Sequence, residues 1–145
     1  MTATVSESRA RSRRGLRFAL LAAVVAGLAV DAYVHFDLAM NYDQNKTGTL
    51  SQGELFRFEA VIAILAALAI LIRPSRLVAA LVALVAGSAL VVLLLYRYVD
   101  ISAIGPIPSM YEPIWFAEKS WSGVGEAVAL LGSLGLLAMP GRPRI

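Results

Sequence analysis

Leu77 to Tyr96 reads LVAALVALVAGSALVVLLLY, twenty consecutive residues without a charged side chain. Twenty helical residues rise about 30 Å, which matches the thickness of the hydrocarbon core of a bilayer. A segment that crosses lipid must satisfy its own backbone hydrogen bonds, so an isolated run of this length predicts a membrane-spanning helix. The stretch therefore predicts an all-α integral membrane protein.

Three further apolar segments extend the pattern to four spans. We expect helices over about 16–40, 52–73, 76–99 and 120–139, in a four-helix bundle that covers residues 16–145. Residues 1–15 are polar and basic, and we expect them to be a mobile cytoplasmic tail. A basic segment before an apolar run is also typical of a signal peptide. Because the second span follows without a soluble domain between them, retention of the first span as an anchor is expected.

The composition excludes several classes of function. Hydrophobic residues make up 59% of the 145 residues and charged residues 16%, against roughly half and a quarter in soluble domains. Cysteine is absent, which excludes disulfides and Cys-ligated metal centres. The sequence contains no nucleophile motif and no phosphate-binding glycine loop, so we expect a protein without catalytic activity.

The positions of lysine and arginine predict the orientation. Nine of the thirteen flank the N-terminus, the connection between the second and third spans, and the C-terminus. Since cytoplasmic loops are enriched in these residues, both termini are expected in the cytoplasm of a multi-pass plasma-membrane protein. The Pro-rich and aromatic loop 100–119 then lies outside, where such rings suit the headgroup layer. The expected partners are the lipid bilayer and either a second copy or a larger membrane complex, with no nucleic acid.

The connection between the first two spans carries a motif. Residues 43–54 read DQNKTGTLSQGE, which resembles the EF-hand calcium loop, where ligands stand at alternating positions between two helices. The resemblance implies a sharp turn with positive φ at Gly48 and calcium ligands at Asp43, Asn45, Thr47, Thr49 (backbone carbonyl), Ser51 and Glu54. Only the first and last ligands carry a full charge, so calcium binding is expected to be weak.

A simpler interpretation uses the same residues. Ser51 and Glu54 have the spacing of a capping box that opens the second helix, and residues 45–48 have the composition of a turn. Both interpretations stay open at this point.

Ionisable residues also lie inside the spans. Asp31, Glu59 and Glu126 each belong to a different span, His35 follows Asp31 by one turn, and Arg97 ends the third span. Each acid shares a helix face with small residues, which indicates that it points into the bundle. In one interpretation the acids and His35 line a cavity for a cation, a proton or a polar ligand. In the other, Arg97 pairs with Glu126, and His35 pairs with Asp31 or Glu59, to fix the helix packing.

Three segments, LSQGELFRFEA, LLYRYVD and GPIPSMYEPIWFAEK, are similar to those of small four-span membrane proteins from actinobacteria. The resemblance covers about residues 31–131 and implies no activity. The leading functional prediction is weak calcium binding by the outer loop. The alternatives are a small transporter or redox-complex subunit that uses the inner acidic and histidine layer, and a purely structural accessory subunit.

Overall fold

The computed structural model describes residues 2–141. Within that range it contains four α-helices and a short 3-10 helix, η1: α1 (Thr2–Ala39), η1 (Met40–Tyr42), α2 (Gln52–Ile72), α3 (Arg76–Tyr98) and α4 (Ala117–Ala138). All four α-helices are long and apolar enough to cross a membrane. The predicted all-α fold is therefore confirmed, with four helices that could each span a membrane, as in a multi-pass membrane protein.

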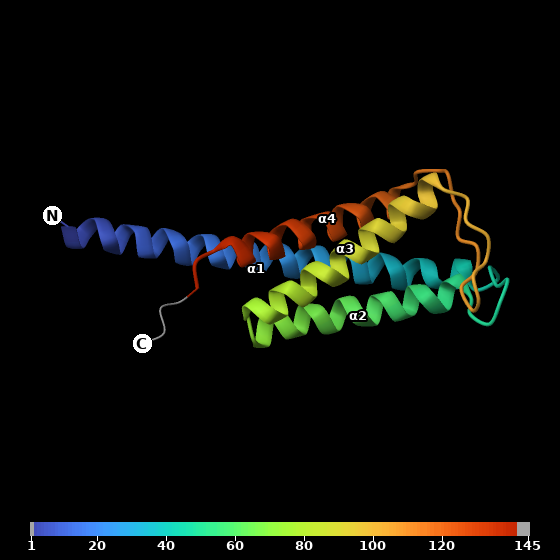
Figure 1. Ribbon diagram of the computed structural model, residues 1–145, viewed down its shortest axis with the longest axis horizontal. Helices are drawn as coiled ribbons and strands as arrows, with labels where there is room; N and C mark the ends of the chain where they lie inside the picture. Colours follow the sequence, from blue (N-terminus) through green and yellow to red (C-terminus); the bar gives the residue numbers. More distant parts are fainter. Residues whose placement is uncertain (1, 142–145) are drawn as a thin grey trace.

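The helices form an antiparallel bundle in which each packs on its neighbours in chain order, and α4 closes the ring against α1 (Figure 1). The packing is most extensive between α1 and α4 and sparsest between α2 and α3. Both long connections, residues 43–51 and 99–116, lie at one end of the bundle, which we call the loop end. The short connection 73–75 lies at the opposite end, the turn end, where α1 enters the bundle and α4 finishes.

The first helix begins well before residue 16, where we expected it to start. α1 begins at Thr2 and projects beyond the turn end as an exposed rod (Figure 1). This segment contains no proline, and its alanine and arginine residues are good helix formers. Because the membrane span already provides a helical nucleus, extending the helix by further turns costs little. Arg17 ties the base of this rod to the bundle, since its Nη2 donates to the Pro74 carbonyl at 2.8 Å. The predicted cytoplasmic arginines 142 and 144 lie outside the described residues.

Side-chain caps begin two of the helices. At the start of α2, Ser51 Oγ accepts from the Glu54 amide at 3.0 Å, and the Ser51 amide donates to Glu54 Oε2 at 2.7 Å. This is the predicted capping box, and it is confirmed. At the start of α3, Ser75 Oγ accepts from the Val78 amide at 3.2 Å. The caps satisfy amide groups that the first helical turn leaves without partners.

Small residues set the close approach of α1 and α4. A Cβ added to Gly27 would lie 2.5 Å from the Gly125 carbonyl oxygen, and one added to Gly125 would lie 2.6 Å from the Gly27 carbonyl oxygen. Only glycine at both positions allows this crossing, which is the small-residue packing typical of membrane helices. The crossing places Asp31 and Glu126 opposite each other, because each lies within one turn of it.

The two long connections are hydrogen-bonded to each other and form a roof over the loop end. The Leu50 amide donates to the Pro106 carbonyl at 3.1 Å, and Asn45 Nδ2 donates to the Ser109 carbonyl at 2.9 Å. The Ser109 amide donates to Thr47 Oγ1 at 3.3 Å. The roof, defined as residues 43–51 and 104–112, therefore joins segments that are about sixty residues apart.

Candidate functional site

The first predicted calcium ligand, Asp43, is engaged by a cation from its own chain. Arg57 donates to both carboxylate oxygens of Asp43, at 2.7 and 2.8 Å. Such a bidentate pair is among the stronger charged contacts in proteins. The hydrogen bonds from Arg57 hold the pKa of Asp43 below its usual range. A calcium ion at this position would have to displace the guanidinium.

Four of the other five predicted loop ligands also have protein partners. Asn45 and Thr47 are bonded to Ser109 in the roof, and Asn45 Nδ2 also donates to Gln52 Oε1. The side chains of Ser51 and Glu54 serve the capping box. Thr49 is exposed. The loop therefore takes the cap-and-turn form in this structure.

Gly48 corrects one expectation of the EF-hand resemblance. Among the described residues, the only glycine with positive φ is Gly105, at 55°, so the predicted left-handed turn at Gly48 is wrong. Gly48 is small for another reason: a Cβ there would lie 2.8 Å from the Gly105 carbonyl oxygen in the facing loop. Calcium binding by residues 43–54 stays a prediction, and it requires rearrangement of the roof.

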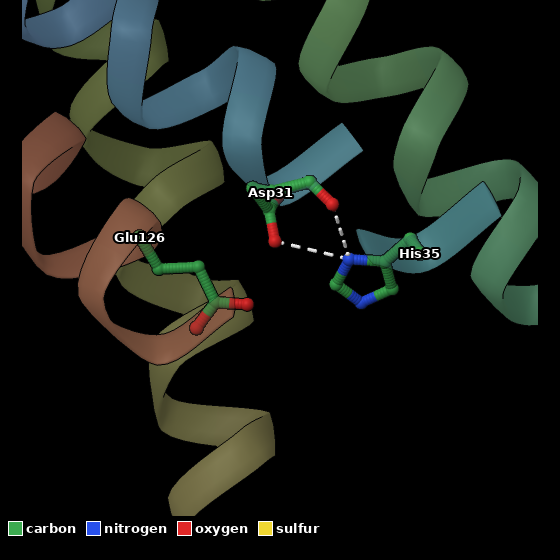
Figure 2. Close-up of side chains that lie close together, drawn as sticks. All are labelled: Asp31, His35 and Glu126. Atoms are coloured by element: carbon green, nitrogen blue, oxygen red, sulfur yellow. Dashed lines mark hydrogen bonds and ion pairs between the residues drawn. The ribbon is translucent and has the colours of Figure 1, made fainter. Parts of the chain in front are cut away.

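A cluster of ionisable residues, Asp31, His35 and Glu126, lies between α1 and α4 (Figure 2). Asp31 and Glu126 are 2% and 1% exposed. His35 Nδ1 lies 3.0 Å from the Asp31 carbonyl oxygen and 3.0 Å from Asp31 Oδ1. Since a carbonyl only accepts hydrogen bonds, Nδ1 carries the hydrogen and Nε2 is left as the second ring nitrogen.

Ser122 bridges the two buried carboxyl groups. Its Oγ lies 2.9 Å from Asp31 Oδ1 and 3.2 Å from Glu126 Oε1. A serine hydroxyl has one hydrogen, so it can donate to only one carboxylate. The second contact needs a proton on that carboxyl group or a cation close by. Glu126 Oε2 is buried and has no hydrogen-bond partner among the described residues.

A cavity of about 430 Å³ lies next to this cluster, between all four helices and the loop 107–116. His35, Glu59 and Glu126 reach its surface, whereas Asp31 lies behind them. Glu59 Oε1 is buried without a partner. The rest of the wall is mostly apolar, with Phe56, Leu93, Met110 and Phe116 among its members. The cavity thus combines an apolar wall with a small group of carboxyl and imidazole side chains.

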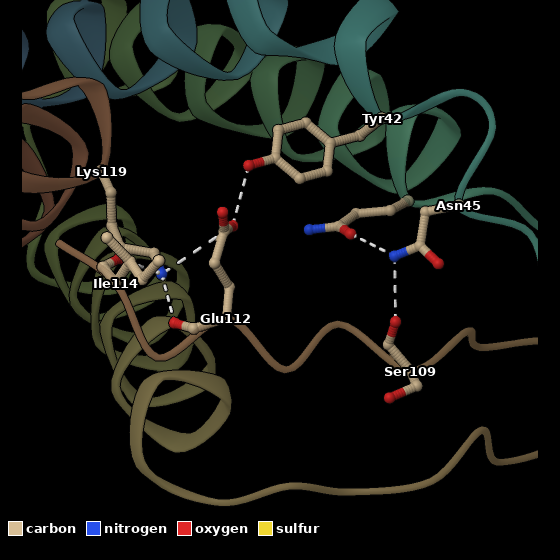
Figure 3. A network of polar contacts seen from close by, with 7 residues as sticks. Tyr42, Asn45, Ser109, Glu112, Ile114 and Lys119 are labelled. Carbon is tan, nitrogen blue, oxygen red and sulfur yellow. Dashed lines mark hydrogen bonds and ion pairs between the residues drawn. The ribbon is translucent and has the colours of Figure 1, made fainter. Parts of the chain in front are cut away.

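A second polar network closes the cavity towards the loop end (Figure 3). Tyr42 donates from its hydroxyl to Glu112 Oε2 at 2.8 Å. Lys119 Nζ donates to the Glu112 carbonyl at 2.7 Å and to the Ile114 carbonyl at 3.1 Å. Sequence reasoning missed Tyr42, Glu112 and Lys119, because a pair seventy residues apart leaves no periodic signal in the chain.

Arg97 does not take the role that the structural interpretation gave it. Its guanidinium lies over the rings of Tyr98 and Trp115, 4.8 and 5.4 Å from their centroids. Among the described residues it forms no ion pair with Glu126, and its Nε is buried without a partner. Arg97 lies in the last turn of α3, where aromatic faces offer it a cation–π contact. The predicted contact between His35 and Asp31, in contrast, is present, with Nδ1 3.0 Å from Asp31 Oδ1; it is an ion pair when the imidazole is protonated.

No protein-family model, curated protein or solved structure matches this chain.

Proposed function

We propose that this protein binds an amphiphilic molecule with a hydrogen-bonding head in the cavity at the loop end, and that it acts without catalysis. The observation that carries this proposal is the pairing of an apolar wall with two carboxylate oxygens, on Glu59 and Glu126, that have no partner. Ligand sites are typically cavities of about 300–1,000 Å³ with apolar walls and a few polar groups that fix orientation. A hydroxyl or amine on the ligand would satisfy the unpartnered oxygens.

The border of the cavity supports entry from the membrane. α2 and α3 diverge from their connection at residues 73–75 towards the loop end (Figure 1). Three apolar side chains from the two sides of this gap line the cavity and are also exposed: Phe58 is 64%, Val92 45% and Leu95 40% exposed. Within a bilayer these side chains face lipid, while the roof covers the loop end. The ligand we propose is therefore dissolved in the membrane.

The turn-end side of the cavity argues for binding rather than conduction. Val24, Leu28, Ala63 and Ala129 lie within two turns of the cluster on that side and are at most 1% exposed. They form part of one hydrophobic core, so the polar groups do not continue as a path through the bundle. A plasma-membrane location with both termini in the cytoplasm, as the arginine distribution predicts, completes the proposal.

Binding of a simple amphiphile tests the proposal directly. We would titrate the full-length protein in lipid nanodiscs with dodecylamine and with dodecanol, and count bound molecules by native mass spectrometry, with dodecane as the probe without a head. We expect one saturable site for the headed probes. Dodecane should bind at least about tenfold more weakly, which corresponds to about 1.4 kcal/mol.

Two variants of α3 form a matched pair. Ala89 lines the cavity, whereas Ala80 is exposed and does not. Ala89→Phe should remove the saturable site, and Ala80→Phe should leave it intact. The double variant with Glu59→Gln and Glu126→Gln should weaken the binding of dodecylamine more than the binding of the other two probes. Equal binding of the headed probes by both phenylalanine variants would refute the proposal.

A further inference from the structure

Asp31, His35 and Glu126 bring two carboxyl groups and an imidazole together between α1 and α4. One ligand atom from each lies within 4.8 Å of the other two, and Figure 2 shows the three side chains facing a common space. We propose that these residues hold one divalent transition-metal ion, with Zn²⁺ the best match to the donor set. This inference shares Glu126 with the amphiphile proposal, but it also requires Asp31 and His35 and does not require the apolar wall of the cavity.

The state of Glu126 points to a missing cation. Its carboxyl group is 1% exposed, yet Oε2 has no hydrogen-bond partner. An unsatisfied acceptor at such a depth is costly, and more so if it is charged. Ser122 can donate to only one of the two carboxylates. Arg97, the cationic residue near the end of α3, lies over aromatic rings instead of reaching the cluster. A bound metal ion would place positive charge next to both carboxylates, which a proton on Glu126 or on His35 supplies when no ion is bound.

The distances are compatible with coordination after a small closure. Zinc binds oxygen and nitrogen at about 2.0–2.2 Å, so neighbouring ligand atoms in a tetrahedral site are about 3.4 Å apart. The observed spread of at most 4.8 Å requires the side chains to approach by roughly 1.4 Å, within the reach of rotation about their own bonds. While Nδ1 donates to the Asp31 carbonyl, only Nε2 is left to bind the ion, so the imidazole must turn to bring that nitrogen towards the two carboxylates. A hydrogen bond of this kind fixes the tautomer of metal-bound histidines.

The donor set favours a transition metal over calcium. Imidazole nitrogen suits zinc and related ions, whereas calcium takes six to eight oxygen ligands. Three protein ligands leave one position of a tetrahedral ion unfilled. Since His35 and Glu126 line the cavity, water can reach that position. The loop 43–54, which offers only oxygen atoms, has the opposite preference, so the two regions should respond to different ions.

Calorimetric titration tests the proposal. The full-length protein, purified in detergent and stripped with EDTA, would be titrated with ZnCl₂, and bound zinc would be counted by elemental analysis after dialysis. We expect one equivalent. His35→Gln and Glu126→Gln should each lower the affinity by at least about 100-fold, because even second-shell substitutions cost 10–100-fold. Co²⁺ should give the visible absorption bands of a tetrahedral site in the wild type and not in these variants.

Matched controls separate the cluster from its surroundings. Glu59→Gln changes a carboxylate of the same cavity outside the cluster, and Asp43→Asn changes the calcium-like loop; both should keep zinc affinity within about threefold. Ser122→Ala changes a neighbour of Glu126 but retains all three ligands, so it should still bind one equivalent. Zinc binding by this variant and not by Glu126→Gln would assign the loss to the missing ligand. Absence of a stoichiometric ion in the wild type would overturn the proposal, as would loss of zinc in Asp43→Asn but not in His35→Gln. Unchanged dodecylamine binding in a protein without zinc would leave the amphiphile proposal standing.

Discussion

The crossing of α1 and α4 should tolerate no side chain at Gly27. A Cβ there would lie 2.5 Å from the Gly125 carbonyl oxygen, whereas ordinary contacts begin at 3.4 Å. The added Cβ would therefore lie about 0.9 Å too close to that oxygen. The atom in the way belongs to helical backbone and cannot rotate aside, so Gly27→Ala must push the two helices apart.

The expected loss of stability is the cost of overpacking reduced by the gain in helix propensity. Overpacking of this kind costs about 1–3 kcal/mol, and the better helix propensity of alanine returns up to about 1 kcal/mol. We expect Gly27→Ala to lower the free energy of unfolding by about 1–2 kcal/mol. Gly123 provides the control, because an added Cβ would meet only Leu93 methyl carbons at 3.8 and 3.9 Å. Gly123→Ala should then be neutral or stabilise by up to about 1 kcal/mol.

The assay is unfolding of the purified protein in mixed micelles by titration with SDS, followed by circular dichroism. The two variants should differ by about 2 kcal/mol, or close to thirtyfold in the unfolding equilibrium constant. Gly27→Ala should also disturb the 2.9 Å contact between Ser122 and Asp31 across the same helix pair. Equal stability of the two variants would show that the crossing is looser than the structure indicates, and the reasoning would fail.

Three further outcomes concern the loop end and the helix caps. Ser51→Ala removes the N-cap of α2 and Ser75→Ala that of α3; each should lower the unfolding free energy by about 1 kcal/mol in the same SDS titration, and no loss at either would contradict the capping argument. Arg57→Gln releases both oxygens of Asp43, so calcium should bind more tightly to the variant; calorimetry without calcium heat in either protein would remove the calcium prediction. Because Arg57 lowers the pKa of Asp43, the pair stabilises the fold above the usual Asp pKa of about 3.9 and stops doing so as the pH falls through the lowered value. The stability of Arg57→Gln should thus change less than that of the wild type between about pH 5 and about pH 3, and identical pH profiles would count against the pair.

Much of the fold could be predicted because membrane spans leave a strong local signal. A helix in lipid needs about twenty apolar residues in a row, and the expected bounds of α2 and α3 agree with the structure to within one residue. The capping box could also be predicted, because Ser51 and Glu54 are only three positions apart in the sequence. The inward direction of Glu126 followed from its small neighbours on the same helix face, and its burial agrees.

What sequence reasoning could not reach depends on contacts between distant segments. Gly48 was assigned a left-handed turn from the pattern of its own loop, but its size is required by Gly105 in the other loop. One interpretation of the sequence pairs Arg97 with Glu126 from charge alone, whereas in the structure its guanidinium lies over the ring of Trp115. Likewise, Arg57 pairs with Asp43 although the two residues are fourteen positions apart, and no periodicity in the chain predicts that contact.

The roof also gives the two helical hairpins of the bundle a second connection. The hairpin α1–α2 and the hairpin α3–α4 are fastened covalently by residues 73–75 at one end, and by the hydrogen bonds of Asn45, Thr47 and Leu50 at the other. Severing the peptide between Ile72 and Arg76 would open only the first fastening. Two separately expressed halves, each a complete pair of helices, would therefore still carry the surfaces that bring them back together in a bilayer.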